Sequence, residues 1–248
     1  MIVPRGTFKG GLKLILPYNE AYEMFKNFGL DLNEEMYGKF DTYAELLVDW
    51  NEKINLTAIT DPLGITEKHF LDSLAVFRDD IVPQNSSVID VGTGAGFPGI
   101  PMKIYRNDLE VTLLDSLNKR INFLSEVSDK LLLGLKCIHS RAEDGAKKTE
   151  LREKFDIATA RAVAPLPILC EYCLPYVKIG GNFVALKGPN ENAKDSFTAY
   201  RTLGAEIGDV REYELPCGDK RQIIIYNKIK ESPSKYPRNP SQIDKKPL

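Results

Sequence analysis

The stretch VIDVGTGAGFPGIP, residues 88–101, decides the fold of this chain. It joins the apolar run VIDV to four glycines within the eight residues that start at Gly92. Three of them, Gly94, Gly96 and Gly99, have the G-x-G-x-x-G spacing of a loop that binds a dinucleotide diphosphate. This spacing is a weak signal by itself, so the ligand has to be argued from the residues around it.

The segments around this stretch predict the sheet to which it belongs. Short β-rich runs alternate with amphipathic segments of helical length, and parallel strands need such crossovers, so we expect an α/β fold with a doubly wound, Rossmann-like sheet. The β-rich runs are residues 88–91, 110–115, 135–139, 155–160 and 181–188, and the helical segments include 117–133 and 165–177.

The last two β-rich runs predict a different connection. Residues 205–215 and 221–229 are separated by only five residues, which favours an antiparallel hairpin at the C-terminal end of the sheet. At the other end of the chain, residues 19–54 have apolar positions at helical spacing, with Asn33 and Asp41 as candidate helix starts. We therefore expect a helical N-terminal extension over 1–80, before a sheet domain over 81–230.

Composition and charge exclude several classes of protein. A net charge of −2 excludes a uniformly basic nucleic-acid binder. No apolar run reaches about 18 residues, and the start MIVPRGTFKGG lacks the pattern of a secretory leader, so we expect a cytoplasmic protein without membrane association. Four scattered cysteines do not suggest a disulfide scaffold, and without a heptad or an evident apolar stripe we expect a monomer.

The C-terminal residues form a basic, Pro-containing tail, assigned to 231–248. From residue 228 onward the sequence KIKESPSKYPRNPSQIDKKPL carries six Lys or Arg and two acids. Its prolines and low apolar content argue against regular structure. Such a tail is either solvated or an arm that contacts phosphate groups, and the composition leaves both open.

Two residues of the glycine stretch separate a diphosphate from a cationic ligand. Pro98 interrupts the fingerprint, and the Asp90 carboxylate, just before the glycines, would repel a diphosphate by about 1 kcal/mol or more at close range. The same carboxylate would attract S-adenosylmethionine, which carries a sulfonium and an amino group with one carboxylate. Gly92 and Gly94 would let that ligand lie close to the backbone, because they have no Cβ.

The ends of the next two strands provide further contacts for such a ligand. Asp115, in LLDS, would accept hydrogen bonds from both ribose hydroxyls, although NAD would use an acid there too. After the third strand, the backbone of Ala142 and the side chain of Glu143 could meet the adenine edge. Glu143 is equally explained as an acid in the first turn of a helix.

Taken together, these residues resemble a known family. The glycine stretch, LLDS at 113–116, SRAED at 140–144 and RAVAPL at 161–166 are similar to the glucose-inhibited division protein B family. Its members are bacterial methyltransferases that act on a guanine N7 of small-subunit ribosomal RNA. Further matches, in order over roughly residues 40–248, are NLTAIT at 55–60, KHFLDSL at 68–74 and the tail segments YPR and KKPL within 236–248.

The resemblance implies a class I methyltransferase sheet, S-adenosylmethionine as cofactor and 16S ribosomal RNA, or the small subunit, as partner. It departs at NPSQID in the tail, where the family is usually more basic and contains glycine. By resemblance, the residues that line the cofactor site are Gly92, Phe97, Asp115, Ser116, Leu117, Ala142, Glu143 and Arg161.

The absence of motifs for other methylation reactions is consistent with guanine N7 as the target. The position after the fourth strand reads ATARAVAP and not the Asn-Pro-Pro-Tyr type motif of exocyclic amine methylation. Methylation of a pyrimidine carbon needs a cysteine nucleophile, whereas Cys170, Cys173 and Cys217 are better explained as core or surface residues. A guanine N7 carries a free lone pair and no proton, so placement alone could supply most of the acceleration.

Four basic residues are candidates for contact with RNA. Arg141 and Arg161 at strand ends could approach phosphate or the guanine edge, and Arg161 is the candidate for positioning the base. Lys187 and the tail residue Arg238 are candidates for phosphate contact. No metal site is expected.

His69 and Asp72 lie three residues apart on one face of a predicted helix. They could form a base and its orienting partner, but a structural pair that braces the N-terminal helices is favoured, because N7 has no proton to abstract. Two other functions share these features: a nicotinamide-dependent dehydrogenase on a similar fold, and a non-catalytic module that binds ribosomal RNA.

Overall fold

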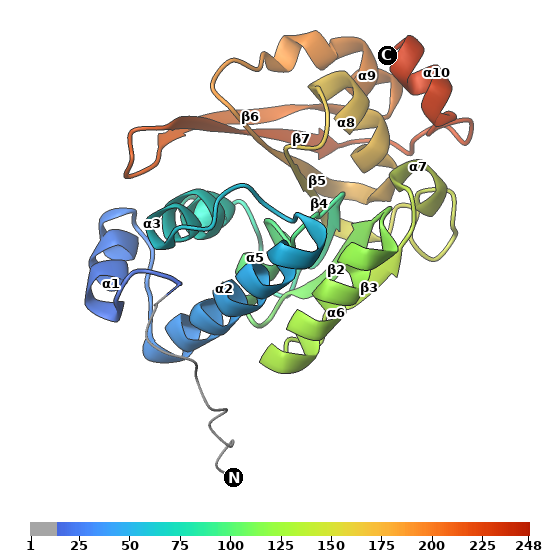
Figure 1. The fold of residues 1–248 in the computed structure, drawn as a ribbon. Coiled ribbons are helices and arrows are strands. Elements are labelled where there is room, and N and C mark those ends of the chain that lie inside the picture. Colours follow the sequence, from blue (N-terminus) through green and yellow to red (C-terminus); the bar gives the residue numbers. More distant parts are fainter. Residues whose placement is uncertain (1–13) are drawn as a thin grey trace.

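A single twisted sheet organises the protein. The computed structural model describes residues 14–248, and within them seven strands follow the order β3-β2-β1-β4-β5-β7-β6 (Figure 1). The strands β1 to β5 are parallel, and β7 runs antiparallel to both β5 and β6. Their bounds are β1 Ser87–Val91, β2 Glu110–Asp115, β3 Lys136–His139, β4 Phe155–Arg161, β5 Val177–Lys187, β6 Ala205–Glu214 and β7 Lys220–Lys228. The predicted doubly wound sheet and the C-terminal hairpin are confirmed.

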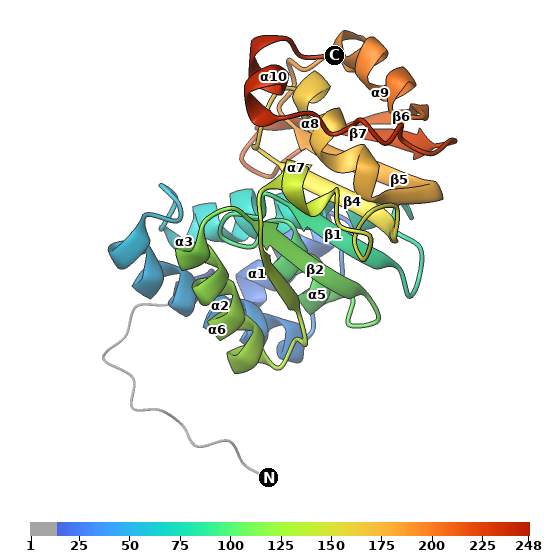
Figure 2. The ribbon, with the colours of Figure 1, turned by 90° about the vertical axis from the view of Figure 1, so that its right-hand side faces the viewer.

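Helices cover both faces of this sheet, as Figures 1 and 2 show from two sides. Neighbouring residues of a strand point to opposite faces, so Val88 packs into one core cluster and Ile89 into the other. The first face carries α1 Tyr18–Asn27, α2 Glu34–Ile54, α3 Pro62–Gly64, the π-helix η1 Ile65–Leu71, α4 Asp72–Leu74, the 3-10 helix η2 Ala75–Phe77, α5 Gly99–Tyr105 and α6 Asn118–Leu131. The second carries α7 Ala142–Gly145, α8 Leu166–Cys173, the 3-10 helices η3 Leu174–Tyr176 and η4 Ala193–Ser196, α9 Phe197–Thr202 and α10 Pro240–Lys245.

The N-terminal helices pack directly against the sheet. Asn33 caps α2, because its side chain accepts a hydrogen bond from the backbone N–H of Met36 at 2.8 Å. Asp41 lies inside α2, so its assignment as a helix start was wrong. Tyr43 of α2 is fully buried and donates its hydroxyl to the carbonyl oxygen of Ala95 at 2.5 Å. The long helix α2 thus packs against the glycine stretch.

The tail is more ordered than its composition predicts. The expectation of irregular structure holds for residues 229–239 but was wrong for Pro240–Lys245, which form α10. Pro240 occupies the first turn of this helix, where proline is well tolerated, and Asn239 and Gln242 form a capping box at its start. Tyr236 and Ile243 are buried. Two apolar side chains and one helix cap therefore hold a segment that is rich in proline and charge.

Two expectations concern the start of the chain and membranes. The prediction that no secretory leader occupies residues 1–11 lies outside the described residues. Within 14–248, no helix has both the length and the apolar character needed to cross a bilayer.

Candidate active site

The glycine stretch forms a tight loop at the carboxyl end of β1. The backbone N–H groups of Gly92 and Thr93 both donate to the carbonyl oxygen of Leu114, at 2.8 and 3.1 Å, which ties the loop to β2. Gly92 and Gly94 have φ of +70° and +61°, a region that favours glycine. A Cβ at Gly94 would meet no described atom within 4 Å, so this glycine opens onto free space in which a ligand could lie.

Asp90 lies beneath this loop. Its side chain is 0% exposed, and its Oδ2 accepts hydrogen bonds from the Thr93 hydroxyl at 2.6 Å and the Gly99 N–H at 2.9 Å. Burial raises the pKa of Asp90 to about 6, against the opposing effect of these two donors. The other oxygen, Oδ1, is buried without a hydrogen-bond partner among residues 14–248. Asp90 therefore shapes the loop from below and is not among the residues that line a pocket.

Asp115 holds the same loop from the end of β2. It is 2% exposed, and its Oδ2 accepts hydrogen bonds from the Gly94 N–H at 3.0 Å and from Arg120 at 3.3 Å. Its Oδ1 accepts the N–H of Leu117, the residue before α6, at 2.9 Å. The predicted ribose-binding acid thus sits against the glycine loop, with both oxygens at the edge where the strands end.

A small pocket of about 160 Å³ lies beside this loop. It brings together Gly92, Ser116, Ala142 and Glu143, as the resemblance implies, and it includes Arg141. Its lining is completed by Val91, Leu114, Ser140, Val163 and Tyr172. We call it the loop pocket. Tyr172 of α8 was missed by the sequence analysis, because its position in an amphipathic helix carries no signal for ligand contact.

Glu143 is the most informative residue of the loop pocket. It is 3% exposed, and its Oε1 is buried with no hydrogen-bond partner in the part of the chain that the structure describes. The nearest cation is Arg141, whose Nη1 lies 3.7 Å away, beyond hydrogen-bond distance. Buried carboxylate oxygens are nearly always hydrogen-bonded in native proteins. A ligand that brings an N–H or O–H group into the pocket would satisfy this oxygen.

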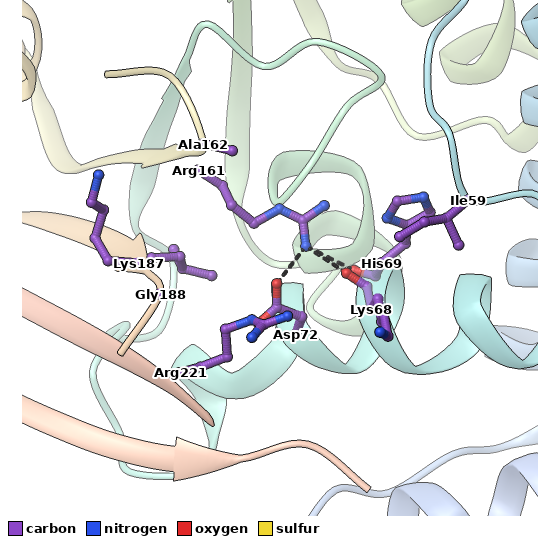
Figure 3. A pocket seen from close by; sticks show the side chains of 10 residues that line it. Ile59, Lys68, His69, Asp72, Arg161, Ala162, Lys187, Gly188 and Arg221 are labelled. Carbon is purple, nitrogen blue, oxygen red and sulfur yellow. Dashed lines mark hydrogen bonds and ion pairs between the residues drawn. The ribbon is translucent and has the colours of Figure 1, made fainter. Parts of the chain in front are cut away.

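A second pocket of about 360 Å³ opens beyond β4 and β5 (Figure 3). Its positive side chains are Lys68, Arg161, Lys187 and Arg221, and its lining is completed by Ile59, His69, Asp72, Ala162, Leu186 and Gly188. We call it the basic pocket. Arg161, expected at the cofactor, lines this neighbouring pocket. Two cations besides those predicted, Lys68 and Arg221, come from η1 and the hairpin.

The two pockets share a wall. Arg161 and Ala162 line the basic pocket, and the next residue, Val163, lines the loop pocket. Ala162 has φ of +55°, a conformation that is uncommon outside glycine and occurs at functional sites. A group bound in one pocket would therefore lie close to a group bound in the other.

Arg161 is held in place at this wall. Its Nη1 donates to Asp72 Oδ2 at 2.8 Å and to the carbonyl oxygen of Lys68 at 3.0 Å (Figure 3). Its guanidinium lies over the ring of Phe97, 4.8 Å from the centroid. Phe97 belongs to the glycine stretch, so Arg161 connects the basic pocket to that stretch.

His69 and Asp72 have separate hydrogen-bond partners. Asp72 pairs with Arg161 and accepts the Tyr213 hydroxyl at 2.7 Å, whereas His69 Nε2 lies 2.9 Å from the Thr57 hydroxyl. The His69 ring stacks on Phe97 at 4.4 Å. Burial and the nearby Arg161 charge lower the pKa of His69 to about 4, so it is neutral at pH 7. No hydrogen bond joins His69 to Asp72 within the described residues, and both line the basic pocket, so the structural role expected for them stays a prediction.

The remaining predicted residues divide between the site and the tail. Lys187 is 9% exposed, donates to the carbonyl oxygen of Ala164 at 2.9 Å and pairs with Glu191 at 2.6 Å. Arg238, expected to contact RNA, instead donates its guanidinium to the fully buried Glu171. Its charge is thus compensated within the protein. Cys170 and Cys173 are buried in α8, which confirms that they are core residues.

Comparisons with solved structures identify the fold. The YcgJ protein of Bacillus subtilis matches with a TM-score of 0.50 at 10% identity, over 65% of this chain and 100% of that chain. A Bacillus halodurans protein, described as a candidate methyltransferase, matches with a TM-score of 0.50 at 12% identity, over 64% of this chain and 99% of that chain. At such low identity these matches support the α/β fold alone.

Comparisons of sequence identify the family. A protein of Clostridium perfringens named ribosomal RNA small subunit methyltransferase G is 55% identical over 224 residues, 89% of this chain and 94% of the relative. A Clostridium botulinum protein of the same name is 52% identical over 235 residues, 93% of this chain and 98% of the relative. The family model for rRNA small subunit methyltransferase G, GidB, matches residues 36–219. This chain therefore belongs to the rRNA small subunit methyltransferase G family.

Proposed function

We propose that the protein transfers a methyl group from S-adenosylmethionine to N7 of a guanine in 16S ribosomal RNA. The observation that carries this proposal is the wall shared by two unlike pockets. One holds the buried Glu143 oxygen that lacks a partner among residues 14–248, which suits a cationic methyl donor, and the other holds four cations, which suit a polyanion. Membership in a family of rRNA methyltransferases supports the choice of substrate.

The loop pocket and the adjoining residues Gly94 and Asp115 fit the donor. The open space above Gly94 would receive its methionine part, and Asp115 would accept the ribose hydroxyls. Glu143 Oε1, buried without a partner in the described chain, would accept a hydrogen bond from the nucleoside. When bound, S-adenosylmethionine supplies an electrophilic methyl group on its sulfonium.

The residues of the basic pocket would position the guanine. Arg161, fixed by Asp72 over the Phe97 ring, would orient the base at the shared wall. A base presented there must come from a loop or leave its stack. Lys187 and Arg141 would meet the flanking phosphates.

The chemistry requires no general base. Guanine N7 attacks with its lone pair, and His69, whose pKa is lowered to about 4, is neutral at pH 7 and only a weak base. No thiol is needed, and Cys170 and Cys173 are buried away from both pockets. Proximity and orientation would supply most of the rate enhancement.

We also infer that the protein acts as a monomer in the cytoplasm, where ribosomes are assembled.

The proposal is tested by incubation with S-adenosylmethionine that carries a labelled methyl group. Three substrates are compared: naked 16S RNA, small subunits from cells that lack this enzyme, and 23S RNA as control. The expected result is one labelled 7-methylguanine in 16S RNA, located by strand cleavage at the modified base. Label on another atom or in 23S RNA would contradict the proposal, and binding of NADH by fluorescence would favour the dehydrogenase.

A further inference from the structure

The tail is fastened to the second face of the sheet by a buried ion pair. Glu171 of α8 is 0% exposed, and its Oε2 accepts a hydrogen bond from Arg238 Nη2 at 2.6 Å. Its Oε1 accepts from both the Nε and the backbone N–H of Arg238, at 2.9 and 2.8 Å. Arg238 Nη1 donates to the carbonyl oxygen of Lys246 at 3.0 Å, which closes the tail on itself. We call the Glu171–Arg238 pair the clasp.

Further contacts lead the tail to the clasp. Arg152 donates to the carbonyl oxygens of Ser232 and Tyr236, at 2.7 and 2.9 Å. The buried Tyr236 packs into the same core cluster as α8. α10 lies against α8, next to which it is seen in Figure 2. The tail therefore runs as a strap over α8.

Helix α8 links the tail to the loop pocket. Tyr172 follows Glu171 directly in α8 and lines the loop pocket. Burial and the charges of Glu143, Asp244 and Glu171 raise the pKa of Tyr172, as expected for a phenol that lies between the pocket and α10. Four residues further on, the Tyr176 hydroxyl donates to the carbonyl oxygen of Ala142, another lining residue, at 2.6 Å.

We propose that the clasp positions α8 so that Tyr172 forms a wall of the S-adenosylmethionine site. Glu171 and Arg238 are then positioning residues for the cofactor, and the tail acts on cofactor affinity and not on RNA affinity. This inference rests on the proposed function of the loop pocket.

The energetics of the clasp support a positioning role. Removal of Arg238 would leave a fully buried carboxylate without its charged partner, which is strongly unfavourable. α8 would shift to bring Glu171 toward water, and Tyr172 would move with it. A displaced Tyr172 would no longer contact the bound cofactor, and the loss of these contacts would weaken its binding.

The test compares Arg238→Gln with Lys245→Gln in the full-length protein. Both variants remove one positive charge from the tail, but Lys245 is exposed and lies outside the clasp. Cofactor affinity is measured by calorimetry with S-adenosylmethionine, and KM for small subunits by methylation. We expect Arg238→Gln to raise the cofactor Kd and KM about fivefold or more, with kcat at saturating cofactor and KM for subunits nearly unchanged. Lys245→Gln should match the wild type.

Several results would overturn the proposal. If Arg238→Gln weakens subunit binding and leaves the cofactor Kd unchanged, the tail is an RNA-contacting arm. If it changes neither, the clasp only stabilises the fold. Should this variant not fold, Arg238→Lys, which keeps the charge but loses the fork, must show the same selective rise in cofactor Kd or the proposal fails. A wild-type protein that binds no S-adenosylmethionine would instead refute the proposed function.

Discussion

The two pockets differ in charge although they share a wall. The loop pocket is lined by one acid, the buried Glu143, and one cation, Arg141, whereas the basic pocket is lined by four cations and one acid, Asp72. The net charge of −2 conceals this division. A nearly neutral chain can thus carry two pockets of different charge next to each other at one edge of its sheet.

The largest effect, on affinity for the cofactor, is expected for Asp115, next to the loop pocket. Asp115→Ala removes the acceptor for the Gly94 and Leu117 N–H groups and for the ribose, and hydrogen bonds to a charged group contribute about 1.5–3 kcal/mol each. Affinity for S-adenosylmethionine should fall about 100-fold or more, as measured by calorimetry. Asp129→Ala, an exposed acid of α6, is the matched control. Unchanged affinity in Asp115→Ala would remove this residue from the site.

The next largest effect, on the rate of methylation, is expected for Arg161 at the wall between the two pockets. Arg161→Ala should lower single-turnover methylation of small subunits about 100-fold at saturating cofactor, because the base loses its oriented guanidinium. Arg161→Lys should not restore the rate, since an ammonium cannot replace the planar fork. Arg201→Ala, exposed on α9, serves as control. Full activity in Arg161→Ala would show that Arg161 does not position the base.

A smaller effect is expected deeper in the basic pocket. Lys187→Ala should weaken binding of small subunits several fold and reduce the slope of log affinity against log salt by about 0.7 to 1, the effect of one phosphate contact. Glu191→Gln should strengthen binding, because it releases the Lys187 ammonium from its ion pair. Filter binding over a series of KCl concentrations measures both. Equal slopes in wild type and Lys187→Ala would assign this lysine a structural role.

The smallest effect is a dependence on pH. Asp90 has a pKa of about 6, raised by burial, so it loses its negative charge as the pH falls through about 6. Attraction for the sulfonium should weaken in that range by about 1 kcal/mol, or about fivefold in Kd. His69 does not interfere, because its pKa is about 4. Calorimetry from pH 7 to 5 should show this fall in the wild type and a flat profile in Asp90→Asn.

Local signals predicted much of the fold and part of the site. The strand runs, the hairpin and the Asn33 cap follow from periodicity and turn chemistry within a few residues. The glycine stretch and LLDS predicted the edge at which the two pockets lie, because parallel strands end together. Lys68 and Arg221 were missed, since charged residues in a helix or hairpin are usually solvated.

The role of Arg238 shows why contacts between distant segments of the chain could not be predicted. Composition described a basic tail, and both interpretations of it placed Arg238 in solvent or on phosphate. Its partner Glu171 is 67 residues away, in a helix whose pattern marks it only as amphipathic. Pairing between such distant residues depends on packing, and one-dimensional patterns carry no information about it.

By itself, the sequence determined the order of strands and helices, the glycine turn that requires positive φ and the acid at the end of the second strand, because each depends on residues close in the chain. Only the tertiary structure decided that Arg161 would face Asp72, that Ala162 and Val163 would separate the two pockets, and that the tail would hold α8. These contacts join segments far apart in the chain, and the packing of two buried cores on one sheet brings them together.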